Sequence, residues 1–158
     1  MSGMFRNIGG RLEGDSIVAL LPATITAGAG NDGQEVDGVI WDRLKTGREG
    51  SLSGALFIFG RATLTDAATL TAAFNVQDGA ASNLSDAADY GSAFASAVVA
   101  TGPTGGGTVD FCVKLDVDLS SAKRYGRAQV TLNLSASGTD TVAAAGLLVL
   151  APAEKLPG

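Results

Sequence analysis

The 158-residue chain has no histidine, a single cysteine and few charged side chains. Without histidine, acid–base catalysis near neutral pH would need a carboxyl group or a lysine with a strongly shifted pKa. The lone Cys112 excludes a disulfide within the chain, and its place between Phe111 and Val113 predicts a small, buried, unreactive side chain. No acids and bases stand at catalytic spacing, so we expect a structural or binding protein and not an enzyme.

Charged residues make up 17% of the chain, against about 25% in an average soluble domain. Two explanations remain open. Ser, Thr, Asn and Gly could carry the surface, or much of the surface could be buried against other subunits. The net charge is −5, and residues 62–113 contain no lysine or arginine. Such a surface repels phosphate backbones, so we expect no nucleic-acid partner.

Residues 1–16 are rich in glycine and have no periodicity. They are either an arm that becomes ordered against a neighbour or a frayed tail. As an arm, they would place Phe5, Ile8 and Leu12 at an interface. The segment lacks the apolar core of a signal peptide, and no stretch approaches the roughly 20 apolar residues of a membrane span. We therefore expect neither export nor a membrane partner.

Alternating apolar and polar residues between turn signals predict about eight strands. The expected strands are 17–27 with a break at Pro22, 35–44, 52–63, 69–77, 92–100, 108–118, 125–135 and 142–150. Residues 102–107 are expected to form a hairpin tip. The prediction is a single all-β domain over 17–152, an antiparallel β-sandwich of jelly-roll type. An extended N-terminal arm (1–16) precedes it and a tail (153–158) follows it.

Two groups of residues are candidates for special roles. Asp110, Asp116 and Asp118 share one strand face and could bind a hard cation. Their spacing of about 6.6 to 7 Å is wide for joint ligation and favours a plain polar face, so we expect no metal and no cofactor. Arg124 and Tyr125 are expected to be structural, with the Tyr125 ring buried and its hydroxyl bonded to nearby backbone.

Several sequence features occur in an order typical of a known type of virion protein. They are the Asn31-Asp32-Gly33 turn followed by Glu35-Val36-Asp37, the strand Leu56-Phe57-Ile58-Phe59, the strand and acidic loop at Val76-Gln77-Asp78-Gly79, the approach of Asp116 to Ser120 toward Ala122-Lys123-Arg124-Tyr125, and a final apolar strand ending at Pro152. In these the chain resembles the head decoration, or cement, proteins of tailed bacteriophages.

The resemblance implies a β-sandwich that binds the outside of an icosahedral phage head and stabilises it. Its partners would be the major capsid protein and other copies of itself in a homotrimer. It would be made in the host bacterial cytoplasm and end in the virion. Two alternatives stay open: another virion component, such as a tail, connector or head fibre protein, or a carbohydrate-binding or adhesion module. A carbohydrate site needs exposed aromatic rings, and the chain has only one Trp, two Tyr and six Phe.

Overall fold

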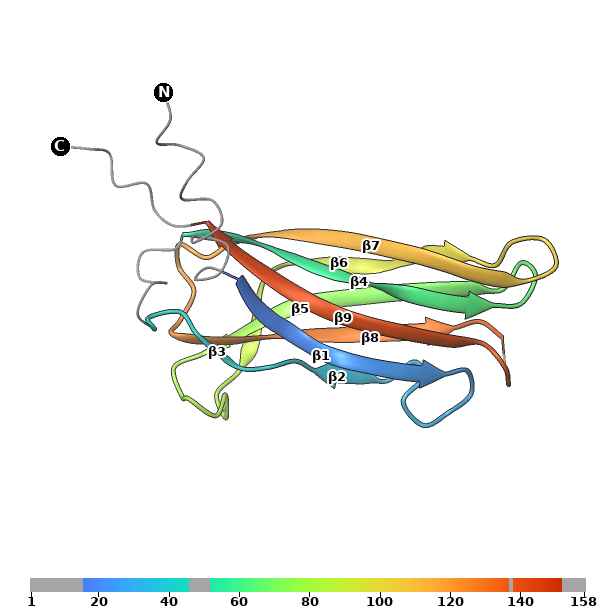
Figure 1. Ribbon diagram of the computed structural model, residues 1–158. Coiled ribbons are helices and arrows are strands. Elements are labelled where there is room, and N and C mark those ends of the chain that lie inside the picture. Colours follow the sequence, from blue (N-terminus) through green and yellow to red (C-terminus); the bar gives the residue numbers. More distant parts are fainter. Residues whose placement is uncertain (1–15, 46–51, 137, 152–158) are drawn as a thin grey trace, which may run out of the picture.

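The computed structural model describes residues 16–45, 52–136 and 138–151, and within them the protein is all-β. Figure 1 shows long strands running along the molecule. They are β1 (Ser16–Thr26), β2 (Glu35–Asp37), β3 (Trp41–Asp42), β4 (Ser53–Leu64), β5 (Thr69–Gly79), β6 (Ala88–Thr101), β7 (Gly107–Asp118), β8 (Tyr125–Leu134) and β9 (Thr141–Ala151). The predicted strands are therefore present, with shifted ends.

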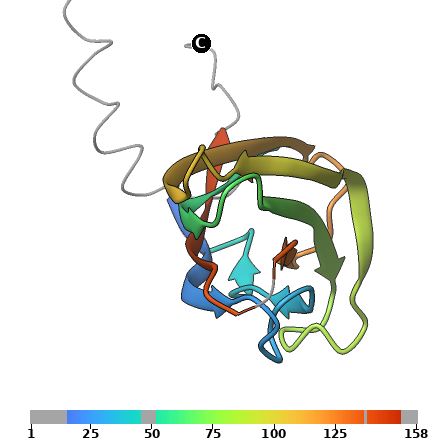
Figure 2. The same cartoon turned by 90° about the vertical axis from the view of Figure 1, so that its right-hand side faces the viewer.

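The strands form two antiparallel sheets that face each other across the core, as the end-on view in Figure 2 shows. Sheet A has the order β1-β9-β4-β7, and sheet B has the order β2-β8-β5-β6, with β3 also on β8. Among consecutive strands in the described part, only β5 and β6 pair with each other. Crossing between sheets at nearly every connection is the jelly-roll topology, which confirms the expected fold class. The predicted hairpin at 102–107 is wrong, because β6 and β7 lie in different sheets.

The predicted strand 35–44 is interrupted at Gly38 and Val39. The backbone N–H of Gly38 still donates to Ala128 of β8 (2.7 Å), but the next N–H, that of Val39, donates to Ala19 of β1 (2.9 Å). The chain therefore bridges the two sheets at this point. A Cβ on residue 38 would overlap the Ala19 carbonyl oxygen, so only glycine permits this approach. β2 and β3 together act as one broken strand along β8.

The core consists of the side chains that point inward, which are every second residue along each strand. In β5 every second side chain is buried, and in β8 the predicted core residues Val130, Leu132 and Leu134 are all buried. The largest fully buried apolar side chains are Leu56, Ile58, Leu64, Leu70, Leu119, Leu148, Val76, Val130 and Val142. Burying one such side chain contributes about 1.5 to 3 kcal/mol. The only tryptophan, Trp41, is also buried, and its ring covers Gly126.

Two side chains lie where the prediction did not place them. Cys112 is exposed, because β7 points its odd-numbered residues, such as Phe111 and Val117, toward the core and its even-numbered residues to solvent. The Tyr125 ring is only half-buried, and the guanidinium of Arg124 lies 5.0 Å from its centroid. The role foreseen for Tyr125 belongs to Tyr90, whose partly buried ring places its hydroxyl 2.7 Å from the carbonyl oxygen of Asp118.

The alanine-rich segment also differs from expectation. The predicted strand began after Gly91, but β6 begins at Ala88 and contains Gly91 at a φ of 71°. The pairing of β6 with β5 shifts register between Tyr90 and Phe94, which is the stretch that holds Gly91. Glycine adopts this backbone conformation without steric cost and so lets the strand continue through the irregularity.

Candidate binding face

The outer surface of sheet A is apolar over three of its four strands. Strands β4 and β9 carry apolar residues on both of their faces, so one set lines the core and the other points outward. Strand β1 adds outward apolar residues beside them. We call the outward apolar residues of the three strands the apolar face; they are Val18, Leu21, Phe57, Phe59, Ala143, Ala145, Leu147 and Val149. Val18, Leu21 and Phe59 are 48%, 63% and 40% exposed. A soluble monomer rarely shows so continuous an apolar surface.

Strand register makes the apolar face contiguous. Leu147 of β9 lies directly between Val18 of β1 and Phe57 of β4. One step along, Ala145 is opposite Phe59, and β1 places its bulge, with the exposed Leu21, beside that row. Cross-strand neighbours on one face are about 4.5 to 5.5 Å apart at Cβ. These side chains are therefore neighbours in a single band across β1, β9 and β4.

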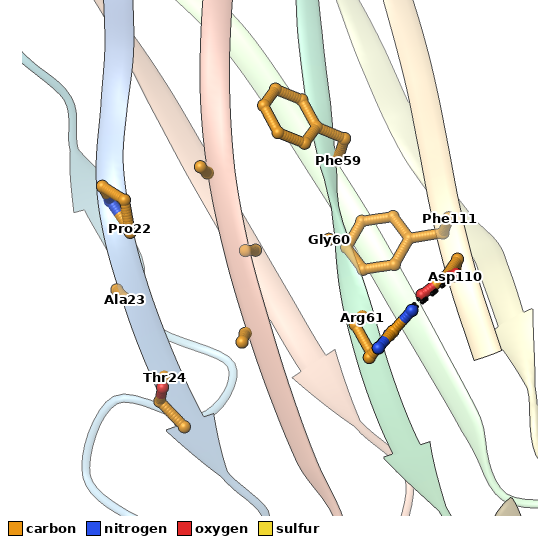
Figure 3. Close-up of a pocket in the computed structure, with 11 residues that line it drawn as sticks. Pro22, Ala23, Thr24, Phe59, Gly60, Arg61, Asp110 and Phe111 are labelled. Atoms are coloured by element: carbon orange, nitrogen blue, oxygen red, sulfur yellow. Dashed lines mark hydrogen bonds and ion pairs between the residues drawn. The ribbon is translucent and has the colours of Figure 1, made fainter. Parts of the chain in front are cut away.

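A depression of about 570 Å³ opens at one end of the apolar face. Figure 3 shows Pro22 and Phe59 at its sides and the Arg61–Asp110 pair at one margin. The small side chains of Ala143, Ala145 and Ala23, with Gly60, keep the centre low. A second open depression, of about 610 Å³, lies toward the other end, around Gly54, Ala55, Val149 and Asp118. Phe57 and Leu147 lie between the two in the strand register.

Strand β7, together with Arg61 of β4, forms a charged rim on one side of the apolar face. Arg61 donates two hydrogen bonds to Asp110, at 2.6 and 3.1 Å, and Lys114 lies 3.0 Å from Asp116. The guanidinium of Arg61 lowers the pKa of the Asp110 carboxyl through this hydrogen bond and charge, and Asp110 in turn raises the pKa of Arg61. The rim thus contains two ion pairs and, at the end of β7, the further carboxylate of Asp118. Exposed pairs add little stability, but here they cancel most of the charge of the rim.

The outer surface of sheet B is mostly polar over β2, β8 and β5, whereas edge strand β6 also exposes Val98. The Arg127 side chain donates to Gln77 (2.8 and 3.0 Å) and pairs with Asp37 (2.6 Å). Gln129 also donates to Asp37 (2.9 Å), while Gln77 donates to Asp89 (3.0 Å). One network therefore joins β2, β8, β5 and β6. The two outer faces therefore differ: the polar side chains of sheet B hydrogen-bond to one another, whereas sheet A exposes apolar side chains.

The structure describes only some of the residues for which the sequence predicts a role. Phe5, Ile8 and Leu12 lie outside the described residues. Asp110, Asp116 and Asp118 do share an outward face, as expected of a polar surface. In the described ranges no three His, Cys, Asp or Glu side chains gather into a metal site, and no helix there is long and apolar enough to cross a membrane.

The apolar face was not predicted, although the sequence contains a signal for it. The runs Leu56 to Phe59 and Val142 to Leu150 are apolar at nearly every position. A strand that is apolar on both sides is typically covered on both sides. Sheet B covers one side of these strands, and within the described residues the other side lies open.

Comparisons with known proteins give only distant likenesses. No family model and no curated protein matches the chain. Among solved structures, those of infectious bursal disease virus Gx and Gt strains are 15% and 14% identical, each with a TM-score of 0.43 over 90% of this chain. The crystal structure of the VP2 subviral particle of that virus is 14% identical, with a TM-score of 0.34 over 85%. This chain spans 31 to 33% of the length of those chains.

Proposed function

We propose that this chain is a virion structural protein, and more specifically a decoration protein that binds the outside of an icosahedral phage head and stabilises it. The observation that carries the proposal is the contrast between the two outer faces: sheet B is mostly polar and internally hydrogen-bonded, whereas sheet A exposes the apolar face. A surface with an apolar centre and a charged rim is the anatomy of a protein–protein interface.

The fold supports an assembly role as well. Jelly rolls occur in viral capsid and lectin domains, and the stiffness of two packed sheets suits a protein that acts by attachment. In the described part of the chain, no cluster of titratable side chains suggests a reaction. We include in the proposal the homotrimer and the major capsid protein as partners, and residues 1–16 as an arm that reaches a neighbour through Phe5, Ile8 and Leu12.

The decisive experiment measures whether the protein is part of assembled particles. We expect it to copurify with heads in a fixed ratio to the major shell protein and to be accessible to antibody on intact heads. Heads that lack it should release their DNA at a lower temperature. A protein found only on tails or at the connector would support a different virion role, and absence from particles would refute the proposal.

Deleting residues 1–15 tests the arm separately. We expect weaker occupancy on heads, because three apolar side chains lose their site, while the circular dichroism and melting of the sandwich stay unchanged. The matched control replaces the same residues with a glycine–serine segment of equal length. Full occupancy after either change would show that the segment is a plain tail.

A glycan-binding role has one observation in its favour. Phe59 is an exposed aromatic ring beside a depression that also presents the Arg61–Asp110 pair, and sugars bind where a ring and charged hydrogen-bonding groups meet. Binding to a glycan array that is lost in Phe59→Ala would favour this function. No binding on the array, together with copurification with heads, would favour decoration.

A further inference from the structure

We propose that the apolar face is covered by another copy of this chain. The inference rests on the self-association included in the proposed function and names the surface that makes it. The exposed apolar groups of β1, β9 and β4 would form the centre of the contact, and the paired charges of β7 would form its rim.

The size of sheet A fits such a contact. Its four strands have 11 or 12 residues each. With a rise of about 3.3 Å per residue and about 4.8 Å between strands, the outer surface measures about 700 Å². A specific interface of standard size takes about 800 Å² from each partner. One face of sheet A therefore offers nearly the whole area that a stable contact between two copies requires.

Charge also favours a second copy. Two molecules with a net charge of −5 repel each other, so they pair more readily through a surface of low net charge. At the rim of the apolar face Arg61 and Lys114 pair with Asp110 and Asp116, and of the carboxylates on the outward side of β7 only Asp118 has no cation among the described residues to balance it. The surface of sheet B instead carries Glu35, Asp37 and Asp89 against one guanidinium, that of Arg127. The apolar face thus carries the smaller net charge and is the one through which copies meet more readily.

The relief of the face fits a partner of the same shape. Half-buried Phe57 and Leu147 lie between two open depressions of about 570 and 610 Å³. Large side chains from one copy can therefore enter a depression of another. Side chains that fill a depression in the neighbouring copy provide the close packing that interface centres share with protein interiors.

The test compares two alanines that occupy equivalent places on the two faces. Ala145 lies on central strand β9 of sheet A, Ala73 lies on central strand β5 of sheet B, and both are half-buried and point outward. Light scattering of the full chain should give a mass well above the 15.8 kDa of one chain, about 32 kDa for two copies in contact through this face and about 47 kDa for the trimer of the proposed function. Ala145→Glu should lower this mass to that of the monomer, and Ala73→Glu should leave it unchanged.

Cys112 supplies an independent readout, because it is the only cysteine and lies opposite Phe59 in the register. A maleimide should label this thiol more slowly in the wild-type assembly than in Ala145→Glu. Should Ala145→Glu fail to fold, Leu21→Lys replaces it, since Leu21 is mostly exposed and contributes little to the core.

Two results would overturn the inference: a wild-type protein that is monomeric at its highest soluble concentration, or a folded Ala145→Glu that keeps the wild-type mass. A wild-type monomer that binds heads, and loses that binding in Ala145→Glu, would assign the face to the shell. That outcome would leave the proposed function standing while refuting self-association, so the two failures are distinguishable.

Discussion

At the scale of single residues, Asp140 is the most deeply buried carboxylate in the described part, with 2% of its surface exposed. It accepts hydrogen bonds from the backbone N–H (2.9 Å) and the hydroxyl (3.3 Å) of Thr65. It thereby fastens the turn after β4 to the start of β9. Asp140→Ala would leave the partly buried N–H of Thr65 without its partner, and we expect a loss of about 1 kcal/mol in the free energy of unfolding, measured by denaturant titration.

The matched control for this change is Asp66→Ala, one residue beyond Thr65 and exposed. An exposed substitution of this kind usually changes stability by no more than about 0.5 kcal/mol. Equal losses in the two variants would show that the Asp140 hydrogen bonds do not hold the turn.

Asp86 organises the loop between β5 and β6. Its carboxylate accepts the backbone N–H groups of Ala80 (2.9 Å) and Ala81 (3.1 Å), and these bonds lower its pKa. A lowered folded-state pKa means that the stabilisation is complete above about pH 4 and is lost as the pH falls through the folded-state value. Asp86→Asn should therefore show a smaller drop in melting temperature than the wild type between about pH 5 and about pH 3.

Calorimetry at several pH values measures that difference. Asp110 and Asp118 also have lowered pKa values, from hydrogen bonds to Arg61 and to Ser120. They remain in Asp86→Asn, so part of the acid sensitivity should persist. An acid-induced drop in Asp86→Asn as large as that of the wild type would contradict the role assigned to the Asp86 loop.

At the scale of elements, the pairing of β4 with β9 depends on a close approach at Gly60. A Cβ there would overlap the carbonyl oxygen of Ala143 and lie 2.8 Å from the Cα of Ala144. Both are backbone atoms in a central strand, so neither can move without displacing the sheet. We expect Gly60→Ala to cost about 1 to 3 kcal/mol through overpacking, measured by chemical unfolding.

Gly30→Ala is the control, because Gly30 lies in the loop after β1 and a Cβ there would meet nothing within 4 Å. It should be neutral or slightly stabilising, since alanine restricts the unfolded chain. If both alanines had the same effect, the contact between β4 and β9 would be looser than the structure indicates.

At the scale of the whole molecule, association through the apolar face should respond to salt as apolar contacts do. Sulfate strengthens the burial of apolar surface, whereas contacts between exposed charges weaken as salt screens them. We therefore expect the mass of the assembly to persist or increase in sodium sulfate. Ala145→Glu should stay monomeric under the same conditions, and dissociation of the wild type by salt would show that the charged rim drives association instead.

The sequence by itself determined the fold class, the approximate strands and the core positions of β8. The physical reason is local, because side chains alternate across a strand with a period of two and turn residues mark where strands end. The same alternation also indicates the exposure of Cys112, because this residue shares the parity of Asp110, Lys114 and Asp116, which point outward. Tyr125 likewise has the outward parity of β8.

Only the tertiary structure decided which strands pair and what each sheet face meets. Residues 102–107 look like a hairpin tip, yet they connect different sheets, because pairing is chosen by contacts between strands distant in sequence. The apolar face also results from the way in which strands distant in sequence come together. Phe57 and Phe59 read as part of a buried strand, but only the layering of sheets A and B shows which side of that strand the core covers and which side is left for a partner.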